Sequence, residues 1–252
     1  MARQLCGAIA AAFAVALIAL AFSGGAAAAT PDLGPNVIVF DASMPTSQIQ
    51  ATVDAIASQQ VSNEFGTQRY ALLFRPGTYG SSDHPLNFQV GYYTSIAGLG
   101  RSPNDVVING SVYVRNQCAS GFCTALTNFW RSLSNLTINV DTPAFGCYSG
   151  EFWPVSQASP MRRVDVNGFA TLMDYCTGPS FASGGFIADS RFNGSTVVNG
   201  SQQQWLVRNA RSTAGRTGSG TRSSPVSWAH RRSASRLRPR AAGPTRRSRR
   251  VR

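Results

Sequence analysis

One pattern occurs four times in the chain, in Val106-Val107-Ile108-Asn109-Gly110, Leu136-Thr137-Ile138-Asn139, Val164-Asp165-Val166-Asn167-Gly168 and Ser190-Arg191-Phe192-Asn193-Gly194. In each segment an apolar residue in the third position is followed by Asn, and the residues before it alternate in direction. Alternation of this kind indicates a strand with one buried face. Asn and Gly tolerate a positive φ angle, so the Asn-Gly pairs predict a tight corner after the strand.

The spacing of these segments predicts a repeating fold. The apolar residues in the third position are separated by 30, 28 and 26 residues, and they are Ile108, Ile138, Val166 and Phe192. Periods of this length are typical of solenoid proteins. The alternative is a meander of β-hairpins, in which two alternating runs would flank each Asn-Gly at a shorter spacing. We therefore predict an all-β solenoid, with the four apolar residues stacked in its interior.

One helix is expected before the strands. Ile49, Val53 and Ile56 recur at helical spacing behind Thr46 and Ser47, which are good residues for the start of a helix. Short β segments punctuated by Gly, Asn and Pro follow. We expect the helix to cap the N-terminal end of a solenoid that begins near Ile38.

Longer stretches carry a resemblance to a known family. They are YALLFRPGTYG (70–80), GLGRSPNDVVING (98–110), NFWRSLSNLTI (128–138), VSQASPMRRVDVNG (155–168) and GGFIADSRF (184–192). Over about residues 35–208 the chain resembles exported bacterial proteins with a right-handed parallel β-helix of the pectin-lyase type. Members are often catalogued as adenylyl cyclases. The residues themselves do not support that activity, because the body contains no Lys and no Gly-rich loop for a triphosphate.

The N-terminus predicts export. Residues 5–22 carry no charge, follow Arg3, and lead into small residues ending at Ala29, as in a secretory signal peptide spanning residues 1–29. The alternative is a membrane anchor, for which eighteen apolar residues are the lower limit. We expect a secreted, extracellular protein that has no membrane segment after cleavage.

The cysteines agree with an oxidising compartment. Four remain after residue 29, and they are Cys118, Cys123, Cys147 and Cys176. An even number in an exported chain favours two disulfides. Three pairings are possible, and the short Gly-containing loop between the first two favours 118–123 with 147–176. A metal site is the alternative, but the spacing lacks a Cys-x-x-Cys pair. We expect no metal and no cofactor.

The charge of the chain is concentrated at its C-terminus. Residues 209–252 contain 13 of the 23 Arg and none of the 11 acidic residues. Three interpretations are open: a basic arm for an anionic polymer, a disordered segment, and translation of a GC-rich gene shifted by one base near Asn209. We expect a disordered tail from residue 209 that arises from such a frameshift. The β-helix domain over residues 30–208 would then be truncated, and no nucleic-acid partner is expected.

Three acidic residues are candidates for catalysis. Asp165 and Asp189 lie on consecutive repeats, and Glu151 stands beside a tryptophan. Glycosidases on β-helix scaffolds use carboxylates on one outward face. The alternative is structural, because the repeat places Arg163 opposite Asp189 and Asp165 opposite Arg191, which predicts a crossed ladder of ion pairs.

Two tryptophans are candidates for sugar binding. Trp153 and Trp130 could offer an aromatic face to a pyranose ring, and the alternative is that both are core or loop anchors. The two histidines have no companions that would form a triad or a metal site. The sequence thus predicts a monomeric secreted protein that acts on or binds extracellular polysaccharide, as a glycoside hydrolase or lyase. The alternatives are a non-catalytic surface-binding protein and a non-functional frameshifted fragment.

Overall fold

The computed structural model describes residues 32–140, 146–177, 182–194, 197–198, 204–212 and 216–217. The chain divides into two compact units at Gly34, and the fold described below belongs to the unit that begins at Pro35. The predicted signal peptide and most of the predicted tail lie outside the described residues. Within these ranges, no helix has the length and apolarity needed to cross a bilayer.

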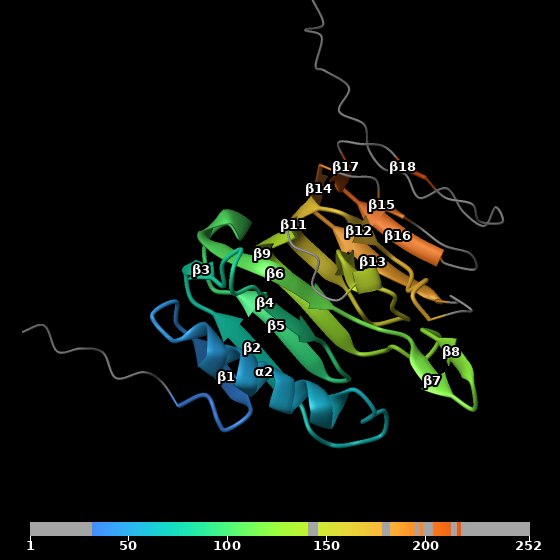
Figure 1. Cartoon of the computed structure of the whole chain (residues 1–252), viewed down its shortest axis with the longest axis horizontal. Coiled ribbons are helices and arrows are strands. Elements are labelled where there is room, and N and C mark those ends of the chain that lie inside the picture. Colours follow the sequence, from blue (N-terminus) through green and yellow to red (C-terminus); the bar gives the residue numbers. More distant parts are fainter. Residues whose placement is uncertain are drawn as a thin grey trace, which may run out of the picture. The chain divides into compact units, whose positions relative to one another are not determined.

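The body is a right-handed parallel β-helix with three faces (Figure 1). The first face runs in the order β1 (Val37–Phe40), β2 (Tyr70–Phe74), β5 (Thr94–Gly98), β9 (Arg131–Val140), β11 (Met161–Gly168), β13 (Gly184–Ala188) and β16 (Gln204–Arg208). The second face contains β3 (Gly77–Tyr79), the first half of β6 (Val106–Tyr113), the second halves of β9 and β11, β14 (Arg191–Asn193) and β17 (Arg211–Ser212).

The third face is made of short strands. They are β4 (Leu86–Gln89), which pairs with the second half of β6, and a separate sheet of β10 (Glu151–Phe152), β12 (Ala170–Thr171), β15 (Val197–Val198) and β18 (Arg216–Thr217). Two 3₁₀ turns, η1 (Pro103–Asp105) and η2 (Gly146–Tyr148), lie between strands. The described antiparallel pair is the hairpin of β7 (Gln117–Ala119) and β8 (Phe122–Thr124), which projects from the coils (Figure 1).

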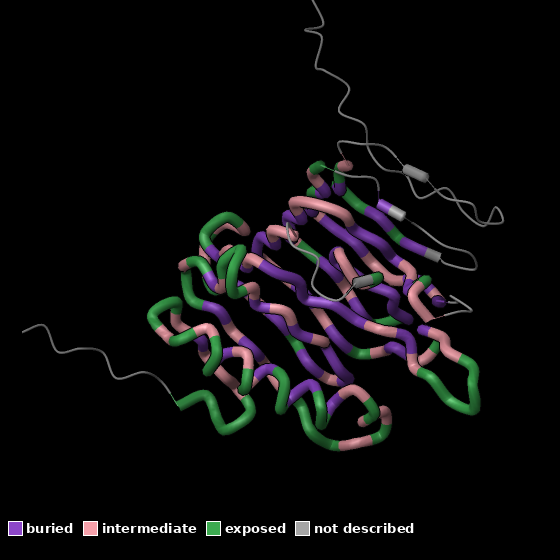
Figure 2. The backbone as a smooth tube through the Cα atoms, viewed as in Figure 1, coloured by how far each residue is buried: buried purple, intermediate pink, exposed green. Residues whose placement is uncertain are grey.

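The interior stack predicted from the repeat is confirmed. Ile108 pairs with Ile138, Ile138 with Val166, and Val166 with Phe192. All four side chains are at most 1% exposed. Figure 2 shows the same alternation of buried and less buried positions along the strands. The period of 26 to 30 residues is therefore the length of each coil between Ile108 and Phe192.

The Asn residues that follow the stack do more than turn the chain. Asn139 donates to the Oδ1 of Asn109 (2.9 Å), Asn167 to the Oδ1 of Asn139 (2.7 Å), and Asn193 to the Oδ1 of Asn167 (2.9 Å). The side-chain amides thus form a ladder along the coils. The expected corner is also present: Gly110 has φ +148°, and a Cβ there would collide with the carbonyl of Leu86.

The N-terminal end of the solenoid is covered by α2 (Thr46–Gln60), as expected. Ile49, Val53 and Ile56 face the core. The predicted Thr/Ser cap is wrong, because Pro45 occupies the N-cap position and makes no side-chain bond there. Its carbonyl instead accepts from two amides of the first turn.

Side chains of α2 also satisfy the backbone of the first coil. The amide of Gln50 donates to the carbonyl of Asn87 (2.6 Å) and accepts from its N–H (3.2 Å), as a neighbouring strand would. Gln60 is buried and donates to the carbonyl of Tyr92 (2.7 Å). Open backbone groups at a sheet edge favour pairing with other chains. The two glutamines therefore close the edge that the helix covers.

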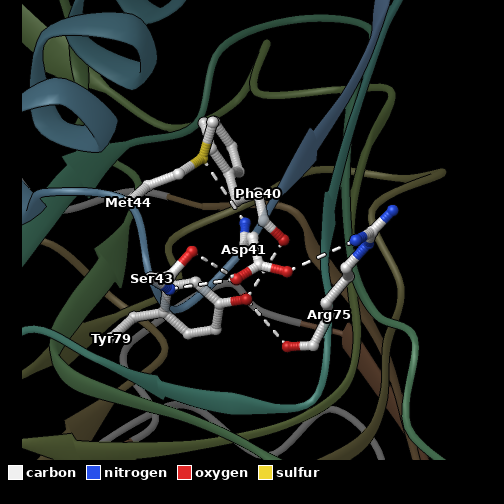
Figure 3. Close-up of polar contacts among 6 residues, drawn as sticks. All are labelled: Phe40, Asp41, Ser43, Met44, Arg75 and Tyr79. Atoms are coloured by element: carbon white, nitrogen blue, oxygen red, sulfur yellow. Dashed lines mark hydrogen bonds and ion pairs between the residues drawn. The ribbon is translucent and has the colours of Figure 1, made fainter. Parts of the chain in front are cut away.

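A polar corner joins the first two coils where β1 and β2 end (Figure 3). The Tyr79 hydroxyl donates to the carbonyls of Phe40 (3.1 Å) and Arg75 (2.8 Å), and burial raises the pKa of this tyrosine to about 12. Asp41 accepts from the backbone and hydroxyl of Ser43 and from Arg75 (3.3 Å). The bond from the Ser43 backbone is the largest of the causes that lower the pKa of Asp41. These contacts fix the bend between two faces.

Two short strands follow residue 209, where the tail is predicted to start. The strands β17 (Arg211–Ser212) and β18 (Arg216–Thr217) pair with β14 and β15, so coil structure continues past the boundary predicted at residue 209. Backbone pairing with the previous coil does not need an apolar side chain at every position, and the boundary at residue 209 stays a prediction. Residues 218–252 lie outside the described ranges, and their frameshift origin stays a prediction.

Asn139→Ala should lower the free energy of unfolding by about 1–3 kcal/mol, because it breaks two ladder bonds and leaves amide groups of both neighbours unpaired. Asn193→Ala removes one such bond at a later coil and should cost about half as much. Urea denaturation of both variants measures the difference. An equal decrease in the free energy of unfolding in the two variants would contradict a separate contribution from each ladder bond.

Candidate functional site

Asp165 is held by its neighbour in the next coil. It pairs in register with Arg191, whose Nη1 lies 3.5 Å from the Oδ2 of Asp165. The aspartate side chain is 8% exposed. Burial raises its pKa, while Arg191 and Arg163 oppose that rise. The ion pair predicted for Asp165 from the repeat is therefore present.

Asp189 has a different partner from the one expected. Its Oδ2 lies 3.3 Å from the Nε of Arg162, and its Oδ1 accepts from Asn209 (3.1 Å). The bond from Asn209 is the main cause that lowers the pKa of Asp189. Arg163 donates instead to the Oδ1 of Asn135 (3.0 Å) and to the carbonyl of Arg101 (2.8 Å). Of the two predicted ion pairs, the one between Asp165 and Arg191 is present, and the one between Asp189 and Arg163 is wrong.

Asp189 and Arg163 have other partners because the chain bends where the first face passes into the second. Asn135, Arg163, Asp189 and Asn209 occupy equivalent positions in successive coils, with φ between +51° and +55°. A left-handed residue in a strand turns its side chain away from the alternation that a straight strand would give. Arg163 therefore reaches toward the previous coil, and Arg162 takes its place beside Asp189.

Glu151 is buried and remote from any open surface. It is 1% exposed, and its Oε2 accepts from the backbone N–H of Val112 (3.0 Å). Its Oε1 has no hydrogen-bond partner among the described residues. Burial raises the pKa of Glu151 well above the ordinary value. The carboxyl group joins β10 to β6 and is a structural group.

The two tryptophans have opposite environments. Trp153 is fully buried, and its Nε1 donates to the carbonyl of Ser159 (3.3 Å), so the sugar platform expected there is wrong. Trp153 belongs to a run of buried residues that follows β10. Trp130, in contrast, is 42% exposed and remains available for contact with a ligand.

Trp130 borders a groove of about 450 Å³ on the outward side of the first face. The floor is a row of small side chains aligned in register across β1, β2, β5 and β9, formed by Val37, Ala71, Ser95 and Ser132. Pro160 continues the row. Small outward residues in four successive coils leave a flat-bottomed depression where larger ones would fill it.

One wall of the groove is a stack of planar side chains. The rings of Tyr93 and Trp130 are nearly parallel, at 11°, with their centroids 5.2 Å apart. The guanidinium carbon of Arg69 lies 3.3 Å from the centroid of Tyr93 on the same groove. Cation–π attraction and ring stacking hold these groups in order. The sequence indicated Trp130 but not Arg69 or Tyr93, because these two residues belong to other coils.

A buried arginine fixes the strand beside this wall. Arg131 is 2% exposed and donates to the carbonyls of Val90 (2.7 Å) and Phe129 (3.2 Å), while its guanidinium lies over Tyr92. Burial lowers its pKa to about 10, so it stays charged at neutral pH. Carbonyl oxygens and a ring face, rather than a carboxylate, compensate the charge. Arg131 thereby positions Trp130 at the start of β9.

The four cysteines are paired. Cys118 bonds to Cys123 at the β7–β8 hairpin, and Cys147 bonds to Cys176 in the loop after β12, which is the pairing that the sequence favoured. None of the four is left as a thiol for the alternative metal site. In the part of the chain that the structure describes, no group of three or more His, Cys, Asp or Glu is placed to hold a metal ion.

Comparisons of sequence and of structure both find similar proteins in one Streptomyces strain. The chain is 49% identical over 179 residues to an exo-beta-1,3-glucanase of Streptomyces sp. strain SirexAA-E, covering 71% of this chain and 27% of that protein. Two solved structures of sacteLam55A from the same organism, one of a variant in complex with glucose, give TM-scores of 0.59 and 0.60. They are 41% and 42% identical, and each match covers 75% of this chain and 31% of theirs.

The chain therefore spans about a quarter to a third of the length of these relatives. No family model matches it. The matched structures agree with the β-helix described above. The relative matched by sequence is named an exo-beta-1,3-glucanase and not an adenylyl cyclase.

Glu151→Gln should make the protein more stable at high pH. A carboxyl whose pKa is raised in the folded state stabilises the fold below its unfolded pKa, and that stability is lost as the pH rises through the folded pKa. The gap between variant and wild type should widen by about 1.4 kcal/mol for each unit of pKa difference. Unfolding curves from pH 4 to 9 test this, with Glu64→Gln as the control for loss of one charge; a constant gap would contradict it.

The pair of Asp165 and Arg191 should show a weak coupling. A double-mutant cycle with Asp165→Asn and Arg191→Gln should give about 0.2–1 kcal/mol, because the arginine end is solvent-exposed. The coupling should fall in 1 M NaCl. Chemical denaturation measures it, and an energy of several kcal/mol would contradict a surface pair.

Proposed function

We propose that this β-helix recognises β-1,3-glucan as part of a glycoside hydrolase activity. The observation that carries the proposal is the 49% identity over 179 residues, or 71% of this chain, to an exo-beta-1,3-glucanase. The groove beside Trp130 supports it, since it offers an aromatic face together with the hydroxyls of Ser95 and Ser132. An apolar ring face beside polar groups suits a pyranose ring, which has both kinds of surface.

The three carboxylates nominated from sequence do not support hydrolysis by these residues. Asp165 and Asp189 are each engaged by an arginine, and Glu151 is enclosed in the core. A glycosidase needs two carboxyl groups that face one substrate from a shared cleft. We therefore assign binding of the polysaccharide to the described residues, and we assign no catalytic residue among them.

The second candidate function is binding of polysaccharide without catalysis. A non-catalytic β-helix that binds extracellular polysaccharide would use the same groove, and the ion-paired state of Asp165 and Asp189 favours it. Export through a cleaved leader at residues 1–29 would place either protein beside extracellular glucan. Both proposals share the glucan and differ in whether the glycosidic bond is cut.

Binding should be selective for β-1,3-linked glucan. The chain should be retained on insoluble β-1,3-glucan and should not be retained on cellulose, which has the same sugar in a different linkage. Release of glucose from laminarin distinguishes the two candidates. Asp165→Asn and Asp189→Asn should leave retention, and any glucose release, at the wild-type level. Loss of glucose release in a folded Asp165→Asn variant would restore a catalytic role to that residue.

A further inference from the structure

The wall of the groove is one column of equivalent positions in successive coils. Register pairing aligns Tyr70 with Thr94, Thr94 with Arg131, and Leu133 with Met161. The residues in the corner before these strands are therefore stacked, in the order Arg69, Tyr93, Trp130 and Ala158. Tyr93, Trp130 and Ala158 share a left-handed backbone, with φ of +55°, +52° and +58°.

The column of planar side chains ends at Trp130. Arg69 covers one face of Tyr93, and Trp130 covers the other. Ala158 takes the next position, where a methyl group replaces a planar side chain. Successive coils are about 4.8 Å apart, so a position without a ring leaves the far face of Trp130 uncovered by the column. Ala158 and Pro160 both line the groove at this place.

We propose that this gap in the column is a sugar subsite, in which one glucose ring of a β-1,3-glucan stacks on the outer face of Trp130 above Ala158. The proposal rests on the proposed function and names the place on the chain where it acts. Trp130 is 42% exposed, whereas Trp153 is fully buried, and this exposure agrees with a ring kept open for a ligand. The hydroxyl of Ser132 on the groove floor can donate to or accept from the sugar hydroxyls.

The surroundings of Trp130 are built to hold the ring still. Tyr93 packs on its inner face, and the backbone N–H of Tyr93 donates to the Trp130 carbonyl (2.6 Å). The next residue, Arg131, is anchored in the core through two carbonyls. A stacking surface that is already ordered loses little conformational entropy when a ligand binds. The contacts that hold the β-helix together therefore also fix the position of the Trp130 ring.

The decisive variant fills the gap without removing any existing contact. Ala158→Tyr should continue the column, and its backbone is suitable because Tyr93 adopts the same left-handed conformation. We expect about tenfold weaker binding of laminarin by this variant, with an unchanged or higher melting temperature. Ala158→Ser keeps the gap open and should bind as the wild type does.

Removal of the ring gives an independent test. Trp130→Ala should also weaken laminarin binding about tenfold. The matched control is Tyr175→Ala, which removes an aromatic ring of similar exposure (44%) that does not line the groove. Isothermal titration calorimetry measures affinity, and circular dichroism establishes that each variant is folded.

The outcomes distinguish the proposed subsite at Ala158 from the proposed recognition of β-1,3-glucan. Weaker binding in both Ala158→Tyr and Trp130→Ala, with wild-type binding in the two controls, supports the subsite. Laminarin binding that is unchanged in a folded Ala158→Tyr variant overturns the subsite and leaves the proposed function standing. If the wild-type chain binds no β-1,3-glucan, both proposals are overturned.

Discussion

Parallel backbone pairing between successive coils is the constraint on which the rest of the structure depends. The strands of one coil pair in parallel register with the corresponding strands of the next coil. Residues one coil apart therefore occupy the same environment. Many inward positions, such as Ile108, Ile138 and Val166, are buried in every coil, so each side chain packs against a similar one above and below it.

This constraint explains why like residues form columns. Ile108, Ile138 and Val166 stack in the interior, and the Asn residues that follow them join into an amide ladder. An amide has a donor and an acceptor, so it can bond to its own copy above and below, which a carboxylate cannot do. Acidic side chains in the column positions need arginine instead. That requirement accounts for the partners of Asp165 and Asp189.

The same constraint shapes the groove. Where a column is interrupted by a smaller residue, the space is left to solvent or to a ligand, because the backbone spacing does not contract to close it. Ala158 interrupts the column of planar side chains that runs from Arg69 through Tyr93 to Trp130. The small outward residues of the first face extend the depression across several coils. Binding in such a protein depends on which residues depart from the repeat.

The sequence by itself determined the coil length, the inward residues, the corner glycines and the capping helix. Each of these rests on local alternation or on the conformational freedom of Gly, which a short stretch of residues expresses directly. Only the tertiary structure decided the sites. Trp130 and Trp153 look alike in sequence, yet one is open and the other buried, because a left-handed residue at Trp130 turns its ring outward. Arg69 and Tyr93 join Trp130 from two other coils, and no local pattern records a contact between residues so far apart in the chain.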